Sequence, residues 1–246
     1  MDGLILLNKP IGLTSAKALY RVRKITGQRK SGHSGTLDPG ASGVLVLCMG
    51  KATKLTELIM DQPKAYRAQA RFDVTSESFD SDSPHVPVSI AKVPTTDQVR
   101  SACRTLEGTI EQVPPRISAV KIGGLPSYRR AREGQAIEPA PRPVRVYWIH
   151  VHRYDWPEIE FEMCCGRGTY VRSLVRDLGV KLNVGGCLTS LVRTRVGPFM
   201  LQDAHTLDTL QHVCPADFLV DLDRARTLLA PERIAIPQRP ACDGPA

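Results

Sequence analysis

The sequence predicts an α+β fold with a mixed sheet, on three observations. Short apolar runs typical of strands are spread along the whole chain, and stretches of helical periodicity lie between them. Their order lacks the regular strand–helix alternation of parallel βαβ units. The 246 residues, of which 42% are apolar and 24% charged, suffice for a sizeable core in one large domain or two unequal ones.

The N-terminal elements begin with a buried strand over Leu4–Asn8, which Pro10 and Gly12 end. Thr14 or Ser15 can cap the helix that follows, because a hydroxyl there accepts a hydrogen bond from a backbone NH of the first turn. That helix runs through residue 25. The next elements are, in order, a loop over 27–42, a buried strand over 44–49, a short helix over 51–60, a strand over 66–72 and an exposed acidic loop over 73–94.

The second half contains a β-hairpin between two helices. Val144–Arg153 and Glu158–Cys164 alternate in polarity and flank a turn at Asp155–Pro157. The other elements are a helix over 95–106 capped by Thr95 or Thr96, an irregular stretch from Pro114, a short basic helix over 127–133, a helix over 169–182, a strand over 188–196 and one or two short helices after Gly197.

Basic residues outnumber acidic ones, 33 to 25, which gives a formal net charge of +8. The excess is concentrated: residues 1–72 hold 12 basic and 4 acidic side chains, and residues 116–153 and 165–195 are similarly basic. If these blocks fold onto one face, that face suits a polyanion such as nucleic acid, which is bound through phosphate contacts with release of counterions. A scattered, solvated surface would have the same composition.

The seven cysteines are odd in number, irregularly spaced and without a CxxC pair, which indicates reduced thiols in a cytoplasmic protein. His150 and His152 would share one face of a strand, but no third ligand is evident, so no metal site is expected. The apolar run Leu4–Leu7 is far too short for a signal peptide or a membrane span. We therefore expect a soluble, cytoplasmic protein.

The segment Gly32–Gly43 has the composition of a functional loop. It reads GHSGTLDPGASG, and its four glycines let the backbone approach a ligand or adopt positive φ. Pro39 restricts Asp38 to extended conformations, so that its carboxylate is held in one direction. Turn chemistry alone is the commoner reason for an Asp in such a turn. The length of the loop and the buried strands beside it count against that reading without excluding it.

Two other kinds of site are disfavoured for this segment. A hydrolase triad of His33, Ser34 and Asp38 is a poor fit, because adjacent His and Ser seldom face one another and no Gly-x-Ser-x-Gly elbow is present. The sequence also has no Gly-x-x-x-x-Gly-Lys phosphate loop.

A second segment, Gly166–Leu174, leads from two glycines into a helix with Thr169 as its expected cap. Arg172 lies in the first turn, where the helix dipole favours anions rather than cations. It is therefore placed to serve another group, such as a buried carboxylate that it would keep ionised. A surface Arg is the commoner arrangement on sequence alone.

Several blocks together resemble the TruB family of pseudouridine synthases. Gly32–Gly43 resembles the family's catalytic loop, which typically reads GH(S/T)G-x-LDP-x-(A/V)(S/T)G. The other blocks occur in family order over about residues 3–200 and are Leu6–Pro10 with Gly12–Ser15, Lys64–Arg67, Ser118–Lys121 with Tyr128–Gly134, Arg167–Arg172 and Leu188–Arg195.

The resemblance implies roles for individual residues. Asp38 would be the catalytic aspartate, and Arg172 would pair with it at the bottom of a basic cleft. Tyr66 would stack on the target uracil and assist proton movement at C5. Asp82 is a loosely aligned candidate for a polar network with Arg172. His33 would fill the space that the base leaves in the RNA. Tyr170 and Leu191 would line the pocket. Lys9 would support the N-terminal loop.

The resemblance also implies a fold and a domain organisation. The expected fold is a pseudouridine-synthase-like, mixed and mainly antiparallel central sheet flanked by helices and loops, over residues 1–200. Residues 201–246 would then form a short C-terminal tail. These roughly 45 residues are mildly acidic and too few for the PUA domain that family members usually carry, so no full PUA domain is expected.

The implied activity is isomerisation of uridine 55 in the T arm of tRNA to pseudouridine, after flipping of the base. No cofactor or metal is expected, because nothing is added or lost. Asp38 could act as a nucleophile or as a base at the sugar. The expected partner is tRNA and the expected state a monomer. Two alternatives are a guide-RNA-dependent synthase subunit and a non-catalytic RNA-binding or folding module, although the set of Asp38, Tyr66 and Arg172 argues against the latter.

Overall fold

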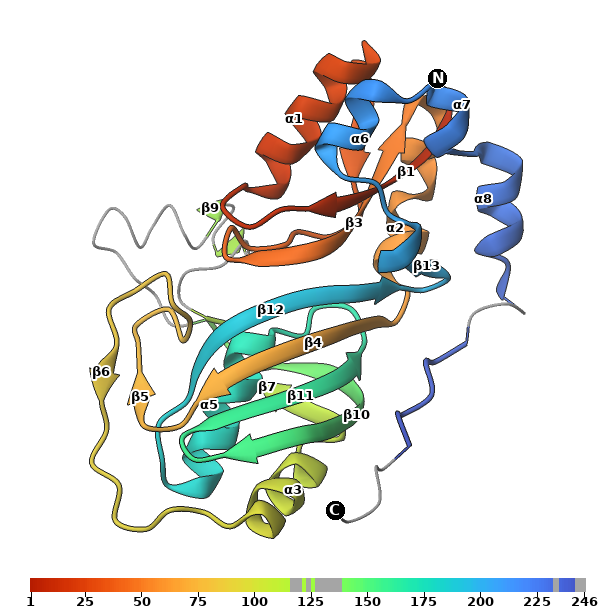
Figure 1. Cartoon of the computed structure of the whole chain (residues 1–246). Coiled ribbons are helices and arrows are strands. Elements are labelled where there is room, and N and C mark those ends of the chain that lie inside the picture. The colour runs from red at the N-terminus through yellow and green to blue at the C-terminus, as the bar shows by residue number, and fades with distance from the viewer. Residues whose placement is uncertain (116–120, 123–124, 127–138, 232–234, 242–246) are drawn as a thin grey trace. The chain divides into compact units, whose positions relative to one another are not determined.

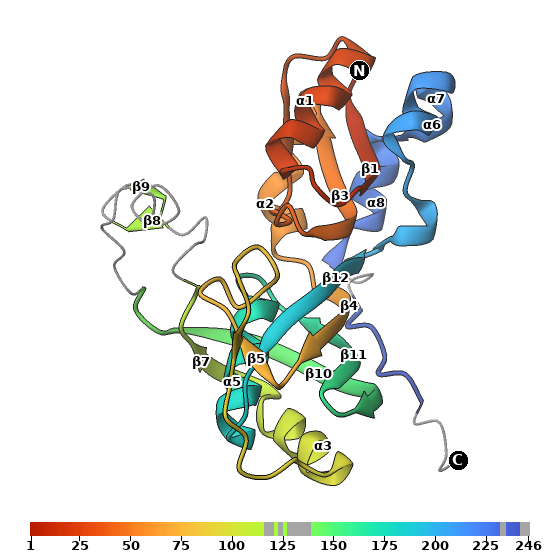
Figure 2. The same ribbon diagram turned by 60° about the vertical axis from the view of Figure 1, so that its left-hand side comes forward.

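The computed structural model describes residues 1–115, 121–122, 125–126, 139–231 and 235–241. The chain divides into two compact units, the first made of Met1–Tyr66 with Leu191–Pro237 and the second of Arg67–Ser190 with Gln238–Ala246. Two strands, β4 (Lys64–Arg71) and β12 (Cys187–Val196), contain residues of both units. Figures 1 and 2 show the elements of each unit from two directions.

The first unit is built on strands in the order β14-β1-β3-β12. They are β1 (Gly3–Lys9), β3 (Ala41–Met49), β14 (Leu219–Asp221) and the end of β12, with β2 (Ser31–His33) paired to β3 and β13 (Phe199–Met200) to β12. β1 runs antiparallel to β3, whereas β12 runs parallel to it, with Leu191 opposite Ala41 and Arg193 opposite Gly43. The sheet is therefore mixed and mainly antiparallel, as the sequence predicts.

Alternate residues of β1 and β3 enter two hydrophobic clusters, because successive side chains of a strand point to opposite faces. One cluster contains Ile5 and Leu7 of β1, and the other contains Leu4 and Leu6. The helices of this unit are α1 (Ser15–Thr26), η1 (Gly50–Leu55), α2 (Thr56–Met60), η2 (Leu201–Asp203), α6 (Leu207–His212), α7 (Pro215–Phe218) and α8 (Leu222–Leu228).

The segment after residue 200 completes the core of the first unit. Leu210 and Phe218 belong to the cluster of Ile5 and Leu7, which also contains Ala18 of α1. Ala225 and Leu229 belong to the cluster of Leu4 and Leu6. The C-terminal segment therefore contributes side chains to both faces of β1 and β3. The domain boundary near residue 200 and the absence of a full PUA domain stay predictions.

The second unit contains strands in the order β12-β4-β11-β10-β7. Its longest strands, β10 (Arg142–Asp155) and β11 (Glu158–Cys165), form the antiparallel hairpin that the sequence predicts. The other elements are β5 (Val74–Thr75), β6 (Val86–Pro87), α3 (Thr96–Thr105), β7 (Gly108–Gln112), β8 (Lys121–Ile122), β9 (Leu125–Pro126) and α5 (Val171–Leu182). α3 packs against both β10 and α5.

The structure corrects several local predictions. The sequence places Ser31–His33 in a loop, but this segment pairs with β3 as β2, because that edge of β3 offers backbone partners that a glycine- and serine-rich segment can reach. The helix predicted from Thr169 begins at Val171, since the Thr169 hydroxyl donates to the carbonyl of Gly166 instead of capping the helix.

Other segments differ in length or type. The helix predicted over 51–60 is a 3-10 turn followed by the short helix α2, the loop over 73–94 contains the paired strands β5 and β6, and the described tail holds three short α-helices rather than one or two. The cap of α1 is Thr14, which accepts from the backbone NH of Lys17 at 3.1 Å. The basic helix predicted over 127–133 lies outside the described residues.

Candidate active site

Asp38 lies in the loop between β2 and β3, and hydrogen bonds hold the peptide groups on both sides of it. The Ser15 hydroxyl accepts from the NH of Leu37 at 2.8 Å and donates to the carbonyl of Leu37 at 3.0 Å. The NH of Gly12 donates to the carbonyl of Pro39 at 2.8 Å. Ser15 is 2% exposed, so water does not compete for these bonds. Ser15 of α1 and Gly12 in the loop before this helix therefore fix the direction of the backbone around Asp38.

Gly43, the third residue of β3 after this loop, lies at a close backbone approach. Its φ is +104°, and a Cβ added there would lie 2.2 Å from the carbonyl oxygen of Arg193 and 2.7 Å from its nitrogen. Gly43 is also opposite Lys9 in β1 and Arg193 in β12. The loop is thus attached to both neighbouring strands at a point where only glycine fits.

Lys9 is a fully buried cation beside this loop. Its ammonium donates to the carbonyl of Pro10 at 2.9 Å and to that of Leu13 at 2.7 Å, which ties the N-terminal loop to β1. Burial lowers the pKa of Lys9 to about 8; the charge of Asp38 acts in the opposite direction, and that of Arg193 lowers the pKa further. Lys9 therefore lies within electrostatic reach of both Asp38 and Arg193.

The burial of Lys9 predicts a pH dependence of stability. The pKa returns to about 10.4 on unfolding, so the unfolded chain binds more protons than the folded chain between about pH 8 and 10.4. The contribution of Lys9 to the free energy of unfolding should rise with pH across this window, by at most about 1.4 kcal/mol per pH unit. Urea denaturation of the wild type and of Lys9→Met at several pH values measures it as a difference. If the difference in the free energy of unfolding between the two proteins did not change with pH, the lowered pKa of Lys9 would be contradicted.

Arg193 is a second buried cation, which the sequence interpretation missed. It is 1% exposed, and its guanidinium donates from Nε to the carbonyl of Val44 at 2.7 Å and from Nη2 to that of Gly35 at 3.2 Å. It thereby joins β12 to both ends of the Asp38 loop. The sequence feature that could have indicated Arg193 is a charged residue inside the strand predicted over 188–196.

His33, Tyr66 and Leu191 also belong to the first unit. Burial, and secondly the charge of Arg193, lower the pKa of His33, so its imidazole is neutral at pH 7. Tyr66 is 8% exposed at the start of β4. Leu191 is opposite Ala41, at the end of the Asp38 loop. The first unit therefore contains five of the seven predicted site residues, on the Asp38 loop and on strands β1, β2, β4 and β12.

Arg172 belongs to the second unit, where α5 and the loop before β6 hold it. It is 5% exposed, its Nη1 donates to the carbonyl of Ser78 at 3.0 Å, and its Nε lies 3.3 Å from Oδ2 of Asp80. Oδ1 of Asp80 accepts from the Ser78 hydroxyl at 2.5 Å and from the NH of Asp82 at 3.0 Å. Asp80 thus contributes a carboxylate to this network and Asp82 its backbone NH. The part predicted for the Asp82 side chain stays a prediction.

Asp38 and Arg172 belong to different units, and the ion pair predicted between them stays a prediction. Tyr170, the seventh predicted residue, precedes α5. Its NH donates to Oε1 of Gln112 at 2.8 Å, and its carbonyl accepts from Nε2 of Gln112 at 3.2 Å. The guanidinium of Arg142 lies 5.3 Å from the centre of its ring. The backbone beside Arg172 is therefore tied to β7.

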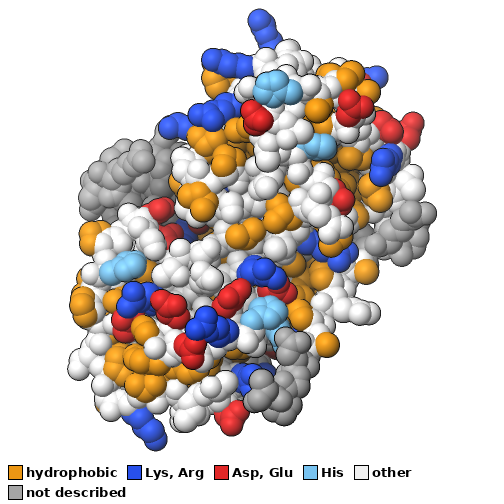
Figure 3. All heavy atoms as spheres, in the orientation of Figure 1, with side chains coloured by type: hydrophobic (Ala, Val, Ile, Leu, Met, Phe, Trp, Pro, Cys, Tyr) orange, Lys and Arg blue, Asp and Glu red, His pale blue; other side chains and the backbone are white. Residues whose placement is uncertain are grey.

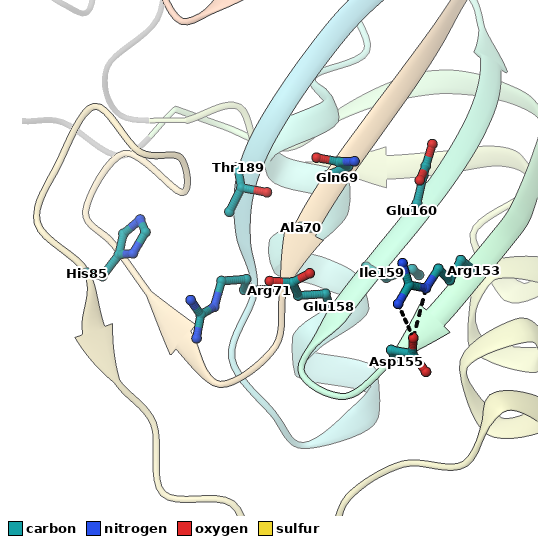
Figure 4. A pocket seen from close by; sticks show the side chains of 10 residues that line it. All are labelled: Gln69, Ala70, Arg71, His85, Arg153, Asp155, Glu158, Ile159, Glu160 and Thr189. Carbon is teal, nitrogen blue, oxygen red and sulfur yellow. Dashed lines mark hydrogen bonds and ion pairs between the residues drawn. The ribbon is translucent and has the colours of Figure 1, made fainter.

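A hollow of about 290 Å³ lies elsewhere in the second unit, at one end of β4, β10 and β11 (Figure 4). Its lining is charged: Arg153 pairs with Asp155, and Arg71 with Asp73 beside it. None of the seven predicted site residues lines this hollow. Paired charges are the ordinary arrangement of a solvated surface, so we assign it no part in the chemistry.

The described residues contain no group of three or more His, Cys, Asp or Glu side chains that could hold a metal ion. The rings of His150 and His152 lie 4.7 Å apart, and Nε2 of His152 lies 3.5 Å from Glu162. Within the same part of the chain, no helix is long and apolar enough to cross a membrane.

Comparison with known proteins identifies the class of protein to which the chain belongs. A family model described as TruB family pseudouridylate synthase (N terminal domain) matches residues 23–171, and one described as tRNA pseudouridylate synthase B C-terminal domain matches residues 172–231. The family model and the relatives below identify an isomerase of the pseudouridylate synthase class. The chain belongs to the TruB family of these enzymes.

Individual relatives agree with this. The chain is 42% identical over 222 residues to tRNA pseudouridine synthase B of Aromatoleum aromaticum, a match that covers 90% of this chain and 71% of that protein. It is 44% identical over 212 residues to the protein of that name from Mycobacterium sp., with 85% and 71% covered. A chain in the crystal structure of a Cbf5-Nop10-Gar1 complex matches with a TM-score of 0.66 and 32% identity. That match covers 84% of this chain and 53%, about half, of the solved one.

Proposed function

We propose that this chain isomerises uridine 55 in the T arm of tRNA to pseudouridine, with Asp38 as the catalytic aspartate. The observation that carries the proposal is the fixing of Asp38 by hydrogen bonds to Leu37 and Pro39, in a loop with the family's motif. The tRNA substrate is supported by the relatives named tRNA pseudouridine synthase B, two of which are 42% and 44% identical to this chain.

The target base must leave its stack before Asp38 can reach the sugar, because the atoms that react lie inside a folded RNA loop. A neutral His33 imidazole suits the vacated space, since it can stack between bases without carrying an unbalanced charge. The Tyr66 ring would stack on the flipped uracil, an interaction that contributes roughly 1–3 kcal/mol per base. His33 and Tyr66 would thus hold the RNA open and the base in place.

The reaction breaks the bond between N1 and C1′, turns the uracil and joins C5 to C1′. A proton leaves C5 and N1 gains one, so atoms and charge balance without a co-reactant. The carboxylate of Asp38 can attack C1′ or remove a proton from the sugar, and both alternatives remain open. In the proposed complex Arg172 pairs with Asp38, while Asp80 and the carbonyl of Ser78 orient the guanidinium.

The test is incubation of the purified chain, with no other component, with an unmodified tRNA transcript, followed by quantification of pseudouridine. We expect near-stoichiometric conversion of one uridine. Absence of product that is restored by a guide RNA and accessory proteins would instead support the guide-dependent alternative. Absence of product under both conditions would contradict the proposal. Cytoplasmic location and a monomeric state also remain predictions.

Ser15→Ala should slow the reaction, because it removes both hydrogen bonds to Leu37 and frees the Asp38 backbone. We expect a rate loss of about 10–100-fold at saturating RNA, the scale of a misplaced catalytic group. The variant should also lose about 1–3 kcal/mol of stability, because a buried NH and a carbonyl lose their partner. Single-turnover kinetics and urea denaturation measure the two effects.

The matched control is Thr206→Ala, which removes the hydroxyl that accepts from the NH of Thr209 at the start of α6. It should cost about 1 kcal/mol of stability without changing the rate. Equal rates for the Ser15 variant and this control would show that the hydrogen bonds to Leu37 do not position Asp38.

A further inference from the structure

Helix α1 carries a stripe of exposed basic side chains on one face. Lys17, Arg21 and Lys24 are all exposed and are spaced four and three residues apart, which places them on one side of a helix. Tyr20 lies beside them with 56% of its surface exposed, and the ammonium of Lys24 lies 4.9 Å from the centre of its ring. Lys and Arg side chains gather over α1 in the space-filling view (Figure 3).

These charges are not balanced by acidic neighbours. Residues 3–37 contain seven Lys or Arg and no Asp or Glu. None of the described residues forms an ion pair with Lys17, Arg21 or Lys24. Like charges four residues apart destabilise a helix by about 0.2–0.5 kcal/mol. The stripe therefore lowers the stability of the helix that carries it, which favours a role in binding.

The stripe starts at the end of α1 that is bonded to the Asp38 loop, but on the opposite side of the helix. Ser15, the first residue of α1, makes the hydrogen bonds to Leu37, and Lys17 lies two residues further on. At about 100° per residue, Lys17 lies about 200° around the helix from Ser15, so the stripe would meet RNA beyond the nucleotides that reach Asp38.

We propose that the α1 stripe binds phosphates of the substrate RNA outside the target loop, an inference that rests on the proposed function. Lys17 and Lys24 lie about 10 Å apart along the helix, at about 1.5 Å per residue. That length corresponds to about three phosphates of one strand, at about 3.4 Å per nucleotide along a duplex. The Tyr20 ring holds the Lys24 ammonium by a cation–π contact. Contacts of this kind supply affinity without reading the base sequence.

The experiment compares RNA binding by Lys17→Gln/Lys24→Gln and by Arg100→Gln/Arg104→Gln. The second pair removes two exposed arginines from α3 and has the same effect on net charge. The dissociation constant of an unmodified T-arm hairpin is measured at several salt concentrations between about 50 and 200 mM. For the α1 variant we expect the slope of log affinity against log salt to fall by roughly 1.8. The rate at saturating RNA should stay within about twofold of wild type.

The outcomes separate this inference from the proposed function. An unchanged slope for the α1 variant, or equal losses for both variants, would overturn the phosphate-binding role, because the effect would then be absent or due to net charge alone. A wild-type protein that neither binds nor modifies the hairpin would overturn the proposed function itself.

Discussion

Asp38→Asn should abolish pseudouridine formation while leaving the fold and RNA binding intact. The amide keeps the shape of the side chain but can neither attack the sugar as an anion nor accept a proton from it. We expect a loss of at least about 10³-fold in the single-turnover rate, within the range for removal of a group that acts directly on the substrate. The dissociation constant of the RNA should change by less than about threefold, because phosphate contacts dominate affinity.

The control for this variant is Asp203→Asn, which removes the same charge from an exposed position after β13. Its rate should equal that of the wild type. If the Asp38 variant were also fully active, the carboxylate would have no part in the reaction, and the proposed mechanism would have to be abandoned.

Gly43→Ala should have the largest effect on stability. A Cβ at this position would lie 2.2 Å from the backbone of Arg193, and the φ of +104° is itself strained for alanine. Since β3 is bonded to strands on both sides there, neither backbone can move away without breaking pairs. We expect the free energy of unfolding to fall by about 2–4 kcal/mol. The rate should also fall, because Gly43 lies in β3, which directly follows the Asp38 loop.

Gly32→Ala is the matched control from the same motif. A Cβ at Gly32 would meet no atom within 4 Å. Its cost should stay below about 1 kcal/mol, as for an ordinary surface substitution. Denaturation of both variants by urea measures the two effects. Similar losses at Gly43 and Gly32 would show that the close approach between β3 and β12 does not require glycine.

Much of the fold follows from local sequence patterns. The strand over Leu4–Asn8, the helix after Thr14 and the hairpin of β10 and β11 are all signalled by periodicity and turn residues within a few positions. The strand β2 was missed because its pairing depends on β3, which lies beyond the glycine-rich loop. Local propensity does not predict such pairing, which tertiary contacts decide.

Some residues of the candidate site could likewise be predicted from local sequence patterns, and others could not. Asp38 and Lys9 stand in recognisable motifs, so the sequence could indicate them. Arg193 and Asp80 were missed, because their partners lie far away in the chain: Arg193 bonds to Gly35 and Val44, and Asp80 pairs with Arg172. The spacing of residues along the chain carries no information about contacts of this kind.

Site-resolved mapping of pseudouridine in an otherwise unmodified tRNA tests the central claim most directly. After incubation with the purified chain, we predict pseudouridine at uridine 55 and at no other position, and none after incubation with the Asp38→Asn protein. Pseudouridine at another position only, or equal modification by both proteins, would contradict the assignment of Asp38 and of its target.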